Sequence, residues 1–242
     1  MSELKPADTA SLDASDANTA RHRRIRSFVL RMGRMTAGQQ RALDQYWSQL
    51  GIDFTPAPLD LDKVFGRQAP RMIEIGFGTG DALAAYAQAH PEMDCLGIEV
   101  HRPGAGHLFL QVERSGLSNV RASCHDAVEV LTQQIPPASI DAIHIFFPDP
   151  WHKARHHKRR LIQPAFADLL ATTLKPGGTL RLATDWQHYA EHMRAVLDNH
   201  AEFINADTTG YVPRPDDRPM TRFERRGHRL GHGVWDMAYR RR

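Results

Sequence analysis

The sequence predicts an α/β protein with a mostly parallel, Rossmann-like sheet that carries helices on both faces. From residue 71 onward, short apolar runs of strand length alternate with longer segments of helical period. A glycine-rich loop, residues 76–80, follows the first of these runs and opens a helix. Strands joined through helices pair in parallel. We therefore expect one mostly parallel sheet of seven strands, closed by an antiparallel strand.

The chain divides into three predicted parts. Residues 1–20 are rich in Ala, Asp, Ser and Thr without apolar periodicity, so we expect a disordered tail. Residues 21–50 form a basic arm and a helix, and residues 51–242 form the α/β domain. The helix is expected over residues 36–50, with Thr36 as its N-cap and Gly51 as its stop.

Within the domain, the elements follow from the apolar patterns. Strands are expected at residues 72–75, 95–100, 120–124, 140–147, 179–183, 203–206 and 234–240. Helices are expected at residues 81–89, 108–115, 127–134, 161–174 and 186–199. Lys175, Pro176, Gly177 and Gly178 are expected to form the turn that closes the fourth of these helices.

Composition indicates a cytoplasmic protein with a real core. Of 242 residues, 41% are hydrophobic, and no run of about 18 apolar residues exists to span a membrane. The first residues lack the apolar region of a secretory signal. Cys95 and Cys124 lack metal-ligand spacing and are expected to be reduced. The sequence shows no long apolar stripe that would be exposed and form an interface. We therefore expect a monomer, and a weak homodimer stays open as an alternative.

Positive charge is concentrated in three clusters. The net charge is only +3, although the sequence pI is about 9.0. Residues 21–34 hold six arginines and no acid, residues 153–160 are again basic, and residues 214–242 are rich in arginine. Such clusters suit a phosphate backbone better than an evenly basic surface does.

The glycine loop predicts a nucleotide-type cofactor site. Its spacing is G-x-G-x-G, from Gly76, Gly78 and Gly80, and it lets the backbone approach a ligand closely. A dinucleotide fingerprint requires a glycine one position later, where Asp81 stands and would repel a pyrophosphate. The loop therefore favours S-adenosylmethionine, whose sulfonium and ammonium are cationic; an NAD-linked reductase is the alternative.

Three acids strengthen this prediction. Glu74 precedes the loop, Glu99 ends the second strand, and Asp126 follows the third. A carboxylate at the second strand end can accept from both ribose hydroxyls, and Asp126 can accept from an adenine amine. We expect all three to converge at the carboxyl edge of the sheet.

The segment 146–160 predicts chemistry on a nucleic-acid base. Pro148 and Pro150 stiffen the backbone around Asp149, and Trp151 follows. Lys153 adds to the positive charge, and the cations and histidines after it are expected to contact RNA: Arg155, His156, His157, Lys158, Arg159 and Arg160. No acid accompanies these histidines, and glycines break up the pair His228 and His232, so we expect no metal site.

With these motifs, the chain resembles the bacterial tRNA (guanine-N(7)-)-methyltransferases of the class I methyltransferase superfamily. The similarity runs from about residue 26 to the C-terminus and is most specific at residues 147–153 and 221–224. The resemblance implies methylation of N7 of the guanosine at position 46, in the variable loop of tRNA. It implies that Glu74, Glu99, Asp126 and Asp149 contact S-adenosylmethionine.

The resemblance also implies roles on the substrate side. Asp149 would be the catalytic carboxylate. The residues implied to touch the target nucleotide are Lys153, Asp185, Thr221, Arg222, Phe223 and Glu224. Asp185 and Glu224 would accept from guanine N1–H and its amine. Two alternatives stay open: methylation of an exocyclic base nitrogen of RNA or DNA, and an RNA-binding protein that has lost catalysis.

Overall fold

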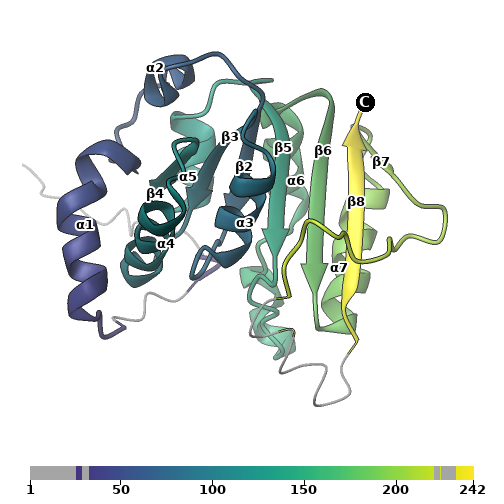
Figure 1. Ribbon diagram of the computed structural model, residues 1–242. Coiled ribbons are helices and arrows are strands. Elements are labelled where there is room, and N and C mark those ends of the chain that lie inside the picture. The colour runs from purple at the N-terminus through teal and green to yellow at the C-terminus, as the bar shows by residue number, and fades with distance from the viewer. Residues whose placement is uncertain (1–25, 29–32, 221–223, 225–232) are drawn as a thin grey trace, which may run out of the picture.

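The computed structural model describes residues 26–28, 33–220, 224 and 233–242, arranged around one eight-stranded sheet (Figure 1). The strand order is β1-β4-β3-β2-β5-β6-β8-β7. Pairs from β1 to β6 are parallel, whereas β8 runs antiparallel to both β6 and β7. The predicted mostly parallel sheet with an antiparallel closing strand is confirmed.

The strands are β1 Gly51–Ile52, β2 Arg71–Ile75, β3 Asp94–Ile98, β4 Val120–Ser123, β5 Ile140–Phe146, β6 Leu174–Thr184, β7 Phe203–Asn205 and β8 Trp235–Arg241. The helices are α1 Ala37–Leu50, α2 Leu61–Phe65, α3 Asp81–Ala89, α4 Arg102–Ser115, α5 Ala127–Gln133, the 3₁₀ turn η1 Ala154–Arg159, α6 Pro164–Thr173 and α7 Gln187–Asp198. No helix among the described residues has the length and apolar character needed to cross a bilayer.

The structure adds three short elements to those predicted. β1, α2 and η1 have two, five and six residues, which is too few to show a period in the sequence. β1 forms because α1 ends at Gly51 and delivers Ile52 beside Ser123 of β4. The prediction of seven strands is therefore wrong by this one edge strand.

Proline explains two boundaries that differ from the prediction. α4 contains residues 108–115, which were expected to lie in a helix, but it begins earlier, at Arg102, and carries a proline in its first turn. α6 begins at Pro164 rather than residue 161 for the same reason. The expected turn at residues 175–178 lies inside β6 as a bulge, where the register shifts from Ile140↔Leu174 to Ala142↔Thr179.

Two helical layers enclose the sheet (Figure 1). One buried cluster joins α1, α3 and α4 to side chains such as Met72, and the other joins α5, α6 and α7 to side chains such as Ile73. Successive strand residues point to opposite faces, so both faces of the central strands are apolar.

The α3 and α4 layer covers only part of its face. Beyond β2, a segment that starts near Val212 crosses in front of β6 and β8 (Figure 1). Val212 donates its N–H to the Asp236 carbonyl of β8, at 2.9 Å. A loop, rather than a helix, therefore covers this half of the sheet.

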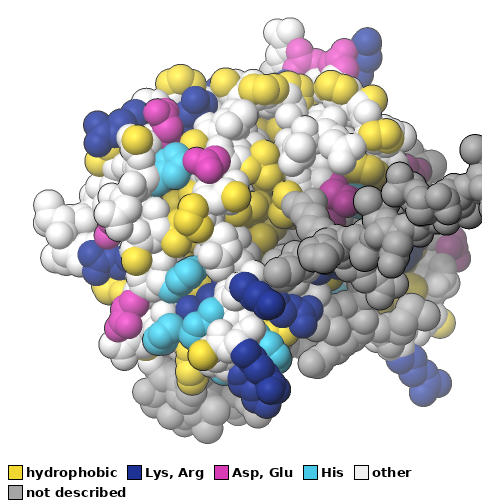
Figure 2. All heavy atoms as spheres, turned by 180° about the vertical axis from the view of Figure 1, so that it is seen from behind, with side chains coloured by type: hydrophobic (Ala, Val, Ile, Leu, Met, Phe, Trp, Pro, Cys, Tyr) yellow, Lys and Arg dark blue, Asp and Glu magenta, His cyan; other side chains and the backbone are white. Residues whose placement is uncertain are grey.

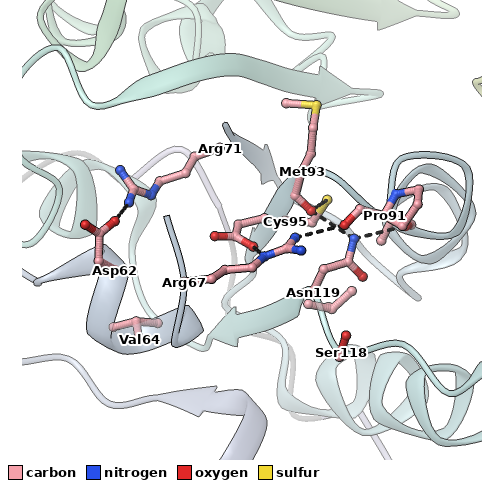
Figure 3. Close-up of polar contacts among 12 residues, drawn as sticks. Asp62, Val64, Arg67, Arg71, Pro91, Met93, Cys95, Ser118 and Asn119 are labelled. Atoms are coloured by element: carbon pink, nitrogen blue, oxygen red, sulfur yellow. Dashed lines mark hydrogen bonds and ion pairs between the residues drawn. The ribbon is translucent and has the colours of Figure 1, made fainter. Parts of the chain in front are cut away.

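A polar cluster stabilises the amino edge of the sheet (Figure 3). Arg67 donates from Nε to Asp94 Oδ1 at 2.6 Å and from Nη2 to the Pro91 carbonyl at 3.0 Å. Asn119 donates to the carbonyls of Ala87, His90 and Met93. These bonds fix the loop between α3 and β3.

We expect Arg67→Met to lower the free energy of unfolding by about 1–3 kcal/mol, because it leaves the fully buried Asp94 carboxylate without this donor. Urea unfolding measures the change. Binding of S-adenosylhomocysteine to the folded variant should be unaltered, since the pair lies at the opposite strand ends. A variant as stable as the wild type would contradict this account.

Candidate active site at the carboxyl edge of the sheet

A cavity of about 760 Å³ opens at the carboxyl ends of β2, β3, β4 and β5. Chain order along the sheet reverses between the neighbouring strands β2 and β5. The α-helices that follow them, α3 and α6, belong to the buried clusters on opposite faces of the sheet. Ligands of open α/β sheets bind in such a crevice.

The glycine loop forms one wall of the cavity. Gly76 and Gly78 have φ of +76° and +57°, and residues other than glycine adopt such positive values only with strain. A Cβ at either position would meet no atom within 4 Å, so the loop backbone is open on that side. The loop can therefore approach a ligand directly.

Glu99 is locked to this loop. Its Oε2 accepts from the Gly78 N–H at 3.0 Å, and its Oε1 accepts from the N–H groups of Val100 and His101 at 2.7 and 3.1 Å. Its side chain lines the cavity. The backbone thus orients a carboxylate before any ligand binds.

Asp126 lines the same cavity from the end of β4. Its Oδ1 accepts from the Val128 N–H at 2.9 Å and caps α5. The preceding His125 also lines the cavity, and its ring stacks on Phe54 with 3.8 Å between the ring centres. Its Nε2 lies 2.5 Å from Glu129 Oε2. The sequence prediction missed His125, although its place at a strand end was a signal.

Glu74 lies beneath the loop rather than on the cavity surface. It shares the α3 and α4 face of β2 with Met72 and is 3% exposed. Its Oε2 is buried without a hydrogen-bond partner among the described residues. Burial, followed by repulsion from Glu99 and Asp81, raises the pKa of Glu74 to about 8. The carboxyl is therefore protonated at neutral pH.

Asp149 lies on a strained turn at the mouth of the cavity. Phe147 and Trp151, which flank the Pro148-Asp149-Pro150 turn, are left-handed, with φ of 53° and 46°. Such backbone costs about 1–3 kcal/mol per residue and persists only where its surroundings hold it. Asp149 is exposed and lines the cavity. The sequence predicted a stiff turn, but gave no sign of the left-handed residues.

Contacts from both sides hold this turn. Trp151 Nε1 donates to the Ser27 carbonyl at 2.9 Å, which seats the described arm residues 26–28 beside the cavity. Arg159 lies 3.8 Å from the Trp151 ring centre and donates to the Phe28 carbonyl. Arg160 Nε donates to the Pro150 carbonyl at 2.9 Å.

The predicted RNA-contacting residues differ in their exposure. Arg155 and Lys158 are exposed, as is the neighbouring Lys153, whereas Arg159 is half-buried. Lys, Arg and His side chains gather at the lower end of the face in Figure 2. His156 and His157 are half-buried. Arg160 departs from the prediction because it is 2% exposed and bonds inward to Pro150 and His188. Its place fits support of the turn, not contact with a phosphate.

The predicted nucleotide contacts are also divided. Asp185 follows β6 and is half-buried, one strand from the turn of Asp149. Glu224 is buried, and its carboxylate accepts from Arg218. Thr221, Arg222 and Phe223 lie outside the described residues, as do His228 and His232. Within the described ranges, no group of His, Cys, Asp and Glu could hold a metal ion.

The sheet order, the glycine loop and the acid at the next strand end define a class I S-adenosylmethionine-dependent methyltransferase. Solved structures share the fold: the 16S rRNA methyltransferase KamB has a TM-score of 0.58 and 14% identity, covering 76% of this chain and 94% of that one. The aminoglycoside resistance methyltransferase NpmB1 has a TM-score of 0.51 at 14% identity, covering 76% and 92%.

The family follows from sequence comparison. A family model described as a putative methyltransferase matches residues 68–237. A tRNA (guanine-N(7)-)-methyltransferase of Edwardsiella ictaluri is 56% identical over 93% of this chain and 95% of its own length. That of Photobacterium profundum is 56% identical over 90% of each chain. The chain belongs to the family of tRNA (guanine-N(7)-)-methyltransferases.

The site fits S-adenosylmethionine. The loop offers an open cradle at Gly76 and Gly78, and Glu99 presents an oriented carboxylate beside it. The unpartnered Oε2 of Glu74 beneath the loop suits a cationic ligand, since positive charge nearby favours the ionised acid. These contacts with the cofactor remain predictions.

Glu74 makes stability depend on pH. The unfolded carboxyl ionises near its ordinary pKa of 4.5, whereas the folded one keeps its proton up to about pH 8. Between these values the unfolded chain binds fewer protons, so stability falls as pH rises, by up to about 1.4 kcal/mol per unit. Glu74→Gln lacks this group, and its stability relative to the wild type should increase from about pH 5 to pH 8.

Urea unfolding of both proteins across that range measures the difference. Parallel pH profiles of the two proteins would show that Glu74 is not held protonated by its burial.

Proposed function

We propose that this protein transfers the methyl group of S-adenosylmethionine to N7 of the guanosine at position 46, in the variable loop of tRNA. Family membership gives the reaction, and one feature of the site supports it. Asp149 lies exposed on a strained turn at the cavity mouth, with the cations Lys153, Arg155 and Lys158 beside it. A carboxylate that meets a base beside an RNA-binding surface suits this chemistry.

On the cofactor side, the chain's own residues would orient the donor. Glu99 would accept from the ribose hydroxyls, and Asp126 from the adenine amine. The glycines Gly76, Gly78 and Gly80 would let the loop approach closely, with Glu74 beneath it. When bound, the cofactor supplies an electrophilic methyl group on a sulfonium.

On the acceptor side, no general base is required for the attack, because N7 of neutral guanine carries a free lone pair and no proton. The protein aligns donor and acceptor, which is worth roughly 7–11 kcal/mol of barrier. Positive charge then develops in the purine ring. Asp149 would stabilise this charge as the catalytic carboxylate, and would also contact the cofactor.

Guanine recognition would come from acceptors that match its donors. Asp185 and Glu224 would accept from N1–H and the 2-amino group of guanine; adenine has a bare N1 and no amino group at C2. Lys153 and the residues Thr221, Arg222 and Phe223 would complete the nucleotide pocket. The base sits within folded tRNA, so it has to be unstacked to reach this pocket.

The decisive experiment is transfer of labelled methyl from S-adenosylmethionine to unmodified tRNA, followed by nucleoside analysis. We expect label in 7-methylguanosine, and its loss when the variable-loop guanosine is replaced. Label in an exocyclically methylated nucleoside would instead support the alternative acceptor, and would overturn the roles given to Asp149, Asp185 and Glu224.

We expect Asp149→Asn to lower kcat by about 10²–10³-fold, the usual cost of removing a group that stabilises developing charge. The dissociation constant of S-adenosylhomocysteine should change far less, because Glu99 and Asp126 remain. Single-turnover assays and calorimetry measure the two effects. Asp44→Asn, an exposed acid on α1, is the matched control. Near-normal turnover of Asp149→Asn would refute the catalytic role.

A further inference from the structure

Arg218 is a fully buried arginine that lies between two buried acids. It is 2% exposed, and it comes from the loop that covers β6 and β8. Its Nε and Nη2 donate to Asp236 of β8 at 3.1 and 2.9 Å. Its Nη1 and Nη2 donate to Glu224 at 2.8 and 3.0 Å. No element of the predicted site included this residue.

The geometry of this cluster requires arginine. Four hydrogen bonds leave the guanidinium in two parallel pairs, and a lysine ammonium cannot reproduce two such forks. Arg214, which is 38% exposed, adds a second cation 3.3 Å from Glu224. The preceding Asp217 binds Arg181 of β6, so consecutive residues fasten the loop to two strands.

The same guanidinium also contacts the end of β5. Its central carbon lies 5.6 Å from the Phe146 ring centre and 5.4 Å from the Phe147 ring centre. A cation at this distance from an aromatic face is attracted to it, most strongly where both are shielded from water. Arg218 therefore links β8 and the covering loop to the two rings that precede the Pro148-Asp149-Pro150 turn.

Phe147 is the residue that needs such a restraint. Its φ of 53° is left-handed, and it is the residue that joins the end of β5 to the Pro148-Asp149-Pro150 turn. Its N–H is bonded to the Ala183 carbonyl of β6 at 2.8 Å, which fixes one side of its backbone. The ring contact with Arg218 fixes its side chain. Both restraints together hold a conformation that would otherwise relax.

We propose that Arg218 is a positioning residue for methyl transfer, which holds Phe146 and Phe147 so that the turn presents Asp149 to the cavity. This inference rests on the proposed function of Asp149. Arg218 itself is not among the residues that line the cavity. Its effect is therefore on kcat through the turn, not on cofactor affinity.

The test compares turnover with cofactor binding in three variants. Arg218→Lys keeps a buried cation but loses the paired forks. Asp236→Asn removes the charge of one of the two acids that hold the guanidinium and leaves the predicted nucleotide contact Glu224 unchanged. Phe147→Leu removes the ring and leaves every bond of the cluster in place.

For each folded variant we expect kcat to fall at least tenfold, with the S-adenosylhomocysteine dissociation constant within threefold of the wild-type value. Combining Arg218→Lys with Phe147→Leu should cost little more than either change alone, because both act through one contact. Arg67→Met, which removes the ion-pair partner of the buried Asp94, is the control and should lose stability without loss of kcat.

Wild-type kcat in Arg218→Lys and in Asp236→Asn would overturn the inference, as would additive losses in the double variant. Failure of the proposed function is seen separately, in the wild-type protein. If its label appears in another nucleoside, kcat on that acceptor decides the role of Arg218 by the same ratios.

Discussion

The parallel pairing of β2 with β5 is the contact on which the rest of the site depends. These strands are adjacent in space and distant in sequence, with Met72 opposite Ala142 and Glu74 opposite His144. Their carboxyl ends bring the glycine loop and the turn of Asp149 to the same edge. Because strand order reverses between them, the chain leaves this edge in two directions and opens the crevice.

Several residues at this edge are in energetically unfavourable states that a purely structural domain would not contain. Glu74 is a buried acid whose environment opposes its ionisation, and Phe147 and Trp151 have left-handed backbones. Each feature opposes folding by itself, and the core around it offsets the cost. Such departures from local preference gather at sites where a ligand or a reaction needs them.

Arginines serve this site in two different ways. Arg155 projects into solvent, whereas Arg160 and Arg218 are buried and donate to carbonyls or carboxylates. The planar guanidinium suits the second use, because its several donors can satisfy fixed acceptors while its face packs on aromatic rings. Arg160 packs near Tyr189, and Arg218 near Phe146 and Phe147. The basic run 153–160 therefore contains both exposed cations and a buried arginine that stabilises the turn of Asp149.

The sequence by itself determined the strand and helix alternation, the glycine loop and the acids that follow the strands. It did so because these features depend on local periodicity and on residue types at strand ends. It could not show that Glu74 is buried beneath the loop, that Arg160 turns inward, or that Phe147 is left-handed. Nor could it show that Arg218 meets Asp236 and Phe147, 18 and 71 positions away. These outcomes depend on contacts between distant segments, and only the folded chain brings those segments together.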